Sequence, residues 1–170
     1  MNDFPELRLV PLLRRLIEGR VDFVVIGGVA VALQGYGRST KDLDITYATD
    51  ADNLEALGAV LIAAGARLRG IAEDLPFTPD PRTLKHVQIL TLDTTDGGLD
   101  LLVDPSGAPP YETLRSRSEV VDYEGLPVRV VALEDLLSMK RAASRPLDLV
   151  DVEALEAARH MARRNRRRER

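Results

Sequence analysis

Residues 21–47 read VDFVVIGGVAVALQGYGRSTKDLDITY, and this stretch decides the fold. It begins with a short apolar run rich in β-branched residues, Phe23–Ile26, which is typical of a buried strand. The run ends at Gly27 and Gly28, which permit a tight turn and the close approach of a ligand to main-chain N–H groups. The composition of residues 29–36 then predicts a short helix that starts at this turn.

The same stretch ends in two aspartates separated by one apolar residue. On a strand, Asp42 and Asp44 point to the same face, about 6.5–7 Å apart. Carboxylates at this separation repel each other unless water or a cation compensates their charge. Hard divalent cations are natural partners, and Mg²⁺ prefers a few carboxylates together with substrate phosphates. The alternative, two solvated residues of an edge strand, fits poorly because Arg38 and Lys41 make the preceding loop basic.

A third aspartate stands inside another apolar segment. Residues 99–104 read LDLLVD and predict a strand that follows a turn at residues 96–98. The charge of Asp100 is costly within such a strand unless it has a partner. The plain alternative is an exposed charge on an edge strand.

The remaining segments predict a mixture of helices and strands. Helical spacing of apolar residues and the place of one proline predict three helices: residues 50–64, residues 132–143, and a helix that begins at Pro146. Alternation predicts three further strands: residues 85–92, and a hairpin of residues 120–123 and 128–131. On the first of these strands we expect Val87 and Ile89 to be buried, with Leu90 as a further candidate.

Composition excludes several classes of protein. The chain has 170 residues, no cysteine and two histidines, so a disulfide framework, a thiolate metal site and a His-rich zinc site are all disfavoured. The length fits a single domain with one core. No apolar run reaches the length of a membrane span, and the N-terminus lacks a signal-peptide pattern. We therefore expect a soluble, cytoplasmic protein with no membrane partner.

Charge is distributed unevenly along the chain. The formal net charge is −4, but residues 159–170 hold seven arginines and one glutamate, a net +6, which leaves −10 on residues 1–158. We predict one domain over residues 1–158, followed by a basic C-terminal tail over residues 159–170. The tail either contacts nucleic acid or an acidic partner, or is a solvated helix end.

Two motifs together resemble a known family. The order of an apolar strand, Gly-Gly, a gap of 13 residues and Asp-x-Asp resembles the signature of the DNA polymerase β-type nucleotidyltransferase superfamily. Within it, the chain is most similar to the small bacterial minimal and AbiEii-type nucleotidyltransferases. These proteins often close with a Lys on one helix and Arg-x-x-Asp-x-x-Asp on the next, which matches Lys140 and residues 145–151 here.

The resemblance implies the fold and the site. The implied fold is a small mixed α/β sheet with helices mainly on one side. The residues that it places in the site are three catalytic and metal-binding carboxylates, Asp42, Asp44 and Asp100, and four contacts to the nucleotide, Gly27, Gly28, Arg38 and Lys140. The bound cofactor would be Mg²⁺ or Mn²⁺. From the residues alone, Arg38 can equally brace its loop, and Lys140 can equally be a solvated helix residue.

The resemblance also implies an activity. It is the metal-dependent transfer of a nucleotidyl group from an NTP to a hydroxyl of a tRNA end, a partner protein or a small molecule, in a toxin–antitoxin or phage-defence setting. One departure stands against it, because many active relatives have Gly-Ser where this chain has Gly27 and Gly28. The alternative is an antitoxin-like binding subunit that keeps the fold without turnover.

Overall fold

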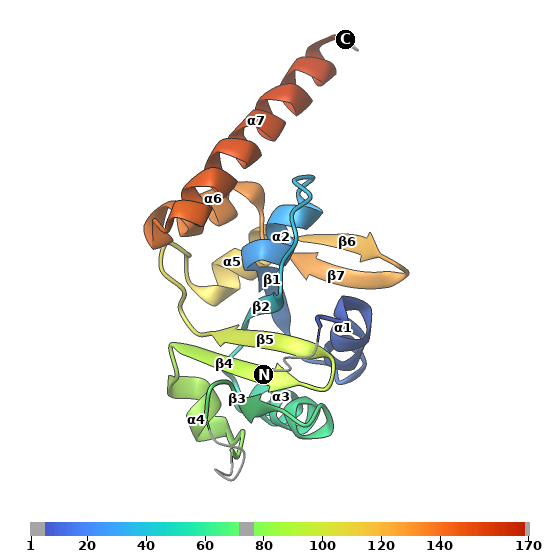
Figure 1. The fold of residues 1–170 in the computed structure, drawn as a ribbon, viewed down its shortest axis with the longest axis vertical. Coiled ribbons are helices and arrows are strands. Elements are labelled where there is room, and N and C mark those ends of the chain that lie inside the picture. Colours follow the sequence, from blue (N-terminus) through green and yellow to red (C-terminus); the bar gives the residue numbers. More distant parts are fainter. Residues whose placement is uncertain (1–5, 72–76, 169–170) are drawn as a thin grey trace.

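The computed structural model describes residues 6–71 and 77–168. Within these residues the fold is α/β, as predicted, and is built on a mixed seven-stranded sheet (Figure 1). The helices are α1 Leu9–Glu18, α2 Gly27–Leu33, α3 Ala51–Ala63, α4 Pro81–His86, α5 Tyr111–Arg117, α6 Leu133–Ala143 and α7 Pro146–Arg168. The strands are β1 Phe23–Ile26, β2 Asp42–Tyr47, β3 Arg67–Leu68, β4 Ile89–Thr94, β5 Gly97–Leu102, β6 Glu119–Tyr123 and β7 Leu126–Val130. Their order across the sheet is β3-β4-β5-β2-β1-β7-β6.

The centre of the sheet places acidic residues side by side. β2 pairs antiparallel with β1, which sets Ile26 opposite Asp44. It pairs parallel with β5, which sets Asp44 opposite Asp100. On the far side of β5, β4 places Thr91 opposite Asp100. The acids therefore come from adjacent strands that are distant in sequence.

The opposite face of these central strands forms the core. Leu43 and Ile45 on β2 and Leu99 and Leu101 on β5 are fully buried, and they alternate with the aspartates. Tyr47, at the end of β2, is also buried, and its hydroxyl donates a hydrogen bond to the carbonyl of Leu84 in α4 at 2.7 Å. Alternation along each strand thus separates the apolar face from the acidic one.

The strand-to-helix turn is tighter than predicted. β1 has the predicted bounds, but α2 starts at Gly27 rather than at residue 29 and ends at Leu33. Gly27 has φ +65°, and a Cβ at this position would lie 2.2 Å from Oδ2 of Asp44. Glycine is therefore required here both for the backbone conformation and for the contact with Asp44.

The prediction for residues 85–92 was wrong in its bounds and for Ile89, but its further candidate, Leu90, is buried. Asp80 caps α4 by accepting a hydrogen bond from the backbone N–H of Thr83, and Pro81 begins the helix, so residues 81–86 are helical. β4 begins only at Ile89, which is 62% exposed, whereas Leu90 and Leu92 are the buried residues.

Two residues of the turn predicted at residues 96–98 are part of a strand instead. Gly97 and Gly98 belong to β5, because Gly97 pairs with Thr94 and Gly98 with Asp93. The predicted hairpin, α6 and the helix that begins at Pro146 are confirmed.

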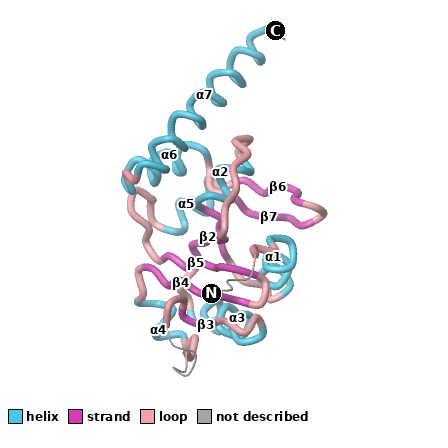
Figure 2. The backbone as a smooth tube through the Cα atoms, viewed as in Figure 1, coloured by secondary structure: helices cyan, strands magenta, loops and turns pink. Residues whose placement is uncertain are grey.

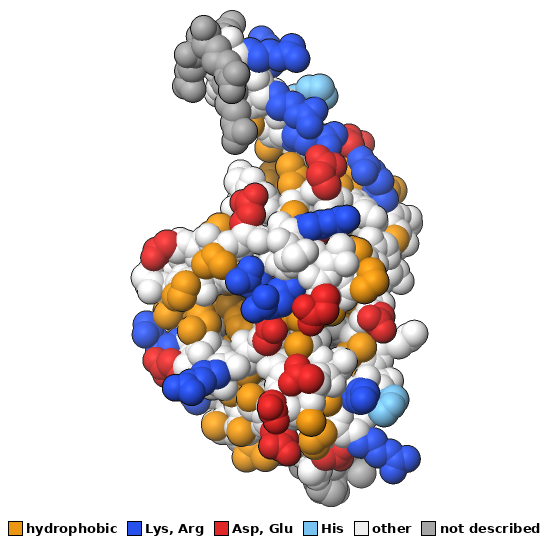
Figure 3. Space-filling view, turned by 180° about the vertical axis from the view of Figure 1, so that it is seen from behind, with side chains coloured by type: hydrophobic (Ala, Val, Ile, Leu, Met, Phe, Trp, Pro, Cys, Tyr) orange, Lys and Arg blue, Asp and Glu red, His pale blue; other side chains and the backbone are white. Residues whose placement is uncertain are grey.

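α7 extends well past the body of the molecule. It continues to Arg168, so the described part of the predicted tail is helical, and residues 169–170 lie outside the described residues. Figures 1 and 2 show its second half projecting alone, and Figure 3 shows Lys and Arg side chains gathered at that end. Among the described residues, none of the helices has both the length and the apolar composition needed to span a membrane.

Candidate active site

The acid face, which consists of Asp42, Asp44 and Asp100, lies on one side of the central strands. Asp44 and Asp100 are register partners across β2 and β5, and Asp42 lies two residues before Asp44 on β2. Asp44 also lies against the start of α2, where a Cβ on Gly27 would be 2.2 Å from its Oδ2. The structure therefore brings all three predicted carboxylates together on two adjacent strands.

These carboxylates are poorly compensated. Burial, assisted by the charges of Asp100 and Asp42, raises the pKa of Asp44 from 3.8 to about 6, while the backbone N–H of Gly28 and the charge of Lys140 act in the opposite direction. This shift means that keeping Asp44 ionised at neutral pH costs roughly 3 kcal/mol. Burial also raises the pKa of Asp100, assisted by the charge of Asp42. Oδ1 of Asp100 is buried and accepts no hydrogen bond from the described residues.

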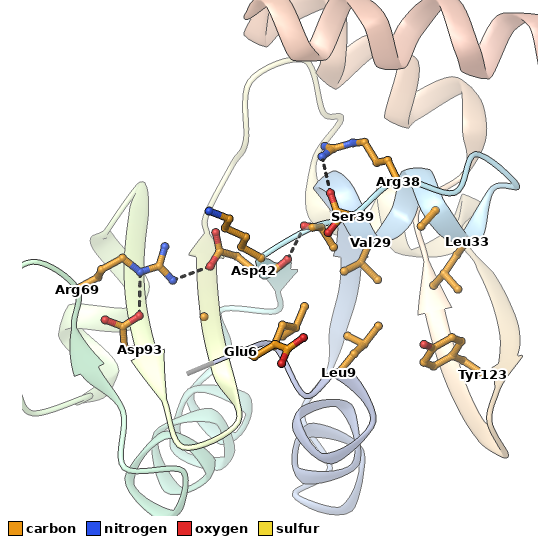
Figure 4. Close-up of a pocket in the computed structure, with 15 residues that line it drawn as sticks. Glu6, Leu9, Val29, Leu33, Arg38, Ser39, Asp42, Arg69, Asp93 and Tyr123 are labelled. Atoms are coloured by element: carbon orange, nitrogen blue, oxygen red, sulfur yellow. Dashed lines mark hydrogen bonds and ion pairs between the residues drawn. The ribbon is translucent and has the colours of Figure 1, made fainter. Parts of the chain in front are cut away.

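The cation that reaches these acids was not predicted from the sequence. Arg69, just after β3, places Nη2 at 2.8 Å from Oδ1 of Asp42, Nε at 2.9 Å from Oδ1 of Asp93, and Nη1 at 3.8 Å from Oδ1 of Asp100 (Figure 4). Burial lowers the pKa of Arg69, but hydrogen bonds to Asp93 and Asp42 raise it above the usual arginine value. Arg69 and Asp93 are thus two members of the site that sequence reasoning missed.

The carboxylate oxygens of the acid face suit a cation, although they are not arranged as a finished metal site. In the part of the chain that the structure describes, no three acidic, His or Cys side chains are arranged to hold a metal ion. Arg69 instead donates hydrogen bonds to both Asp42 and Asp93 (Figure 4). The unsatisfied oxygen of Asp100, next to the raised pKa of Asp44, is nevertheless the chemistry that a hard divalent cation satisfies.

A second cluster of charges lies at the junction of α6 and α7. The α6–α7 network consists of Arg38, Lys140, Arg145, Asp148 and Asp151. Nζ of Lys140 lies 3.0 Å from Oδ1 of Asp148 and 2.9 Å from Oδ2 of Asp151. Nε of Arg38 lies 2.9 Å from Oδ1 of Asp151, and Nε of Arg145 lies 2.7 Å from Oδ2 of Asp148. Burial acts against the charge of Asp148, but hydrogen bonds from Arg145 and Lys140 lower its pKa.

The network shows how Arg38 and Lys140 are held in this structure. Asp151 is fully buried and Lys140 is 6% exposed, so Lys140 is not a solvated helix residue. Arg38 ties the loop before β2 to α7 through Asp151, which is the bracing role. A contact of Arg38 or Lys140 with a nucleotide stays a prediction.

Two pockets flank the acid face. One, of about 470 Å³, is lined by Gly27, Asp44, Asp100, Lys140 and Arg145, among other residues. The other, of about 880 Å³, lies beyond Asp42. Its polar side includes Lys41, Asp42 and Arg69, and its apolar side includes Leu9, Val29, Leu33 and Tyr123 (Figure 4). The acids therefore lie between two pockets, each of which combines charged with apolar lining residues.

The second glycine of the pair is also crowded. A Cβ at Gly28 would lie 2.8 Å from Oγ1 of Thr40, and this hydroxyl donates a hydrogen bond to the carbonyl of Asp42 at 3.1 Å. The position where relatives carry a serine hydroxyl thus lies against a threonine hydroxyl in this chain.

Several solved structures have a similar fold. The lincosamide antibiotic adenylyltransferase LnuA with lincomycin bound matches at 17% identity with a TM-score of 0.60, covering 89% of this chain and 96% of that one. ANT(2")-Ia in complex with adenylyl-2"-tobramycin matches at 18% identity with a TM-score of 0.51, covering 91% and 94%. A nucleotidyltransferase-like protein from Paracoccidioides brasiliensis matches at 19% identity with a TM-score of 0.51, covering 89% and 78%. At these identities the likeness shows the fold alone.

Comparison with protein families gives a more specific result. No curated protein matches the chain. The family described as "Nucleotidyl transferase AbiEii toxin, Type IV TA system" matches residues 12–169. This match includes the Gly-Gly and Asp-x-Asp motifs, Asp100 and the α6–α7 network, and it confirms the resemblance found in the sequence. Because the match spans nearly the whole chain, the protein belongs to the AbiEii family of nucleotidyltransferases.

Proposed function

We propose that this protein transfers a nucleotidyl group from an NTP to a hydroxyl acceptor, with Asp42, Asp44 and Asp100 as its catalytic and metal-binding carboxylates. The observation that carries the proposal is the pairing of two buried carboxylates, Asp44 and Asp100, whose charges lack sufficient partners at the wall of a pocket. Membership of a nucleotidyltransferase family supports the reaction class.

The smaller pocket suits the phosphates of an NTP. Lys140 and Arg145 bring positive charge to the same wall as Asp44 and Asp100. Gly27 also lines this pocket, and its missing side chain leaves room for Asp44 against the backbone. When bound, Mg²⁺ or Mn²⁺ would neutralise charge on the phosphates and lower the pKa of the acceptor hydroxyl. Asp100, whose pKa is raised by burial, is suited to accept the proton of that hydroxyl.

The larger pocket is where we place the acceptor. It borders Asp42 on the side away from Lys140 and Arg145, so an acceptor there would face the phosphates across the acids. LnuA and ANT(2")-Ia hold antibiotics or their adenylyl products, whereas the family description names a toxin. A tRNA end, a partner protein and a small molecule therefore stay open as acceptors, in a toxin–antitoxin or phage-defence setting in the cytoplasm.

Two observations favour a second candidate, a binding subunit without turnover. Arg69 already pairs with Asp42, and Gly28 lacks the hydroxyl that many active relatives have. The hydroxyl of Thr40 lies against Gly28 and is suited to take the place of the missing serine.

A transfer assay separates the two candidates. The protein is incubated with each α-³²P-labelled NTP and Mg²⁺ or Mn²⁺, in turn with total tRNA, a cell-protein extract, lincomycin and tobramycin. We expect the wild type to label one acceptor class and Asp44→Asn to label none. Binding of NTP without labelling of any acceptor would support the binding subunit. Equal labelling by Asp44→Asn would contradict the assigned carboxylates.

A further inference from the structure

Arg69 reaches the acid face from the edge of the sheet. β3 has two residues and pairs with β4, and Arg69 follows it directly. From there the guanidinium extends across β4, where Nη2 also donates a hydrogen bond to the carbonyl of Leu92 at 3.0 Å. The Arg69 side chain is 23% exposed, so this is a largely buried contact rather than a surface ion pair.

The space for this contact is built into β5. A Cβ at Gly98 would lie 1.9 Å from Oδ1 of Asp42 and 2.3 Å from Nη2 of Arg69. Gly98 has an ordinary strand conformation, so its backbone does not require glycine. Any side chain at this position would nevertheless separate Arg69 from Asp42. The missing side chain thus permits the ion pair.

Arg69 and a metal ion would compete for the same atoms. Oδ1 of Asp42 accepts from Arg69 at 2.8 Å, and Oδ1 of Asp100, which lacks a hydrogen bond, faces Nη1 at 3.8 Å. A divalent cation that uses these oxygens meets a positive charge within a few ångströms, which is unfavourable at low dielectric. Asp93 offers Arg69 a second carboxylate, bound through Nε at 2.9 Å, on the side away from Asp44.

We propose that Arg69 is a built-in counterion of the acid face, which a divalent metal ion displaces from Asp42 while Asp93 retains it. The proposal rests on the metal site of the proposed function. Arg69 then compensates the acids in the metal-free protein and sets the concentration of metal ion at which the site fills. Asp93 is a positioning residue that keeps the displaced guanidinium near the site.

Metal binding without nucleotide tests this role. The affinity for Mn²⁺ is measured by isothermal titration calorimetry with MnCl₂ on the full-length wild type, on Arg69→Gln and on Lys41→Gln. Lys41 is an exposed cation next to Asp42, so its variant removes the same charge without removing the Arg69 ion pairs. We expect Arg69→Gln to bind Mn²⁺ about tenfold more tightly than the wild type, a difference of about 1.4 kcal/mol. Lys41→Gln should stay within about threefold of it.

The outcomes distinguish this inference from the proposed function. If the wild type binds Mn²⁺ and Arg69→Gln binds no more tightly than Lys41→Gln, the counterion role is wrong and the metal site stands. If neither the wild type nor Arg69→Gln binds Mn²⁺, the metal site itself is wrong, and this inference fails with it.

The role of Asp93 is tested by a double-mutant cycle. Without Asp93, Arg69 has a stronger preference for Asp42, so Asp93→Asn should weaken Mn²⁺ binding in the wild-type background. In the Arg69→Gln background the same substitution should have a clearly smaller effect, because the competing guanidinium is gone. Equal effects in both backgrounds would overturn the role of Asp93.

A measurement on the unmodified sequence does not depend on whether a variant folds. In ¹⁵N-labelled wild type, the guanidinium resonances of Arg69 should shift on saturation with Mg²⁺. Those of Arg115, whose Nε lies 2.8 Å from Asp22 in a separate ion pair, should stay unchanged. Unchanged Arg69 resonances in the Mg²⁺-bound protein would show that the ion does not displace the guanidinium.

Discussion

The acid face and the α6–α7 network line the same pocket and use the same kinds of side chain, but they balance charge differently. In the network, Lys140 lies within 3.0 Å of both Asp148 and Asp151. On the acid face, Asp44 and Asp100 are register partners with raised pKa values, and Nη1 of Arg69 comes only within 3.8 Å of Oδ1 of Asp100. Buried charges with matched partners hold the fold together, whereas buried like charges are retained at a cost to stability and mark a binding site.

Breaking the network should have the largest effect on stability. Asp151→Asn removes the charge that Lys140 and Arg38 share while burying both cations near a neutral amide. We expect a loss of about 3 kcal/mol or more in the free energy of unfolding, measured by urea denaturation. Glu153→Gln, at an exposed position of the same helix, is the control and should change it by less than about 0.5 kcal/mol. A small loss in Asp151→Asn would remove the contrast between the two regions.

On the acid face, unlike in the network, removing a carboxylate charge should stabilise the protein, and this effect should depend on pH. Because the pKa of Asp44 rises from 3.8 to about 6 on folding, the folded state binds more protons than the unfolded state between these values. The wild type should therefore lose stability relative to Asp44→Asn as the pH rises from about 4 to about 6, by up to roughly 3 kcal/mol. Denaturation midpoints of both proteins across this range check it. A difference that is constant with pH would mean that the pKa of Asp44 is not raised.

A bound metal ion and nucleotide should relieve the acid face. A ligand at about one hundred times its Kd stabilises the folded state by about 2.7 kcal/mol, which corresponds to a rise of about 5–10 °C in Tm for a chain of this size. We expect such a rise with Mg²⁺ or Mn²⁺ and at least one NTP, and thermal denaturation measures it. If the Tm with every NTP at millimolar concentration equals that of the protein without ligand, the nucleotide site is excluded.

The projecting end of α7 should have the smallest effect, and none on folding. Arg163, Arg164 and Arg167 are exposed there, beyond the α6–α7 network. If this end contacts RNA, deletion of residues 163–170 should weaken RNA binding and flatten its salt dependence, measured by titration across a salt series. If the full-length and the truncated protein bind RNA with equal affinity at every salt concentration, this end of α7 is a solvated helix end.

The parts of the site that the sequence predicts are those set by local pattern. The alternation of Asp42, Leu43 and Asp44 fixes which residues face away from the core. The costly charge of Asp100 pointed to a partner, and the parallel pairing of β2 with β5 places that residue beside Asp44. The glycine at position 27 was predicted from its turn, and the structure adds its contact with Asp44.

The parts that it does not predict depend on long-range pairing. Arg69 enters the site because a two-residue edge strand pairs with β4, and nothing local to residues 67–69 shows where that side chain reaches. Asp93 was missed because the strand was expected at residues 85–92, whereas it runs from Ile89 to Thr94 and therefore includes Asp93. The partners of Lys140 were likewise hidden, because they lie on a second helix whose packing angle the sequence does not give.

The most direct test of the central claim is the stability of Asp44→Asn at pH 7, measured by urea denaturation with and without Mg²⁺ and NTP. If Asp44 is a functional carboxylate held against like charges, the variant should be as stable as the wild-type apoprotein or more stable. It should also lose both nucleotidyl transfer and the stabilisation by metal and nucleotide. If Asp44 is instead a structural acid, the loss of its charge should cost about 1–3 kcal/mol. That cost, with the response to Mg²⁺ and NTP intact, would contradict the account.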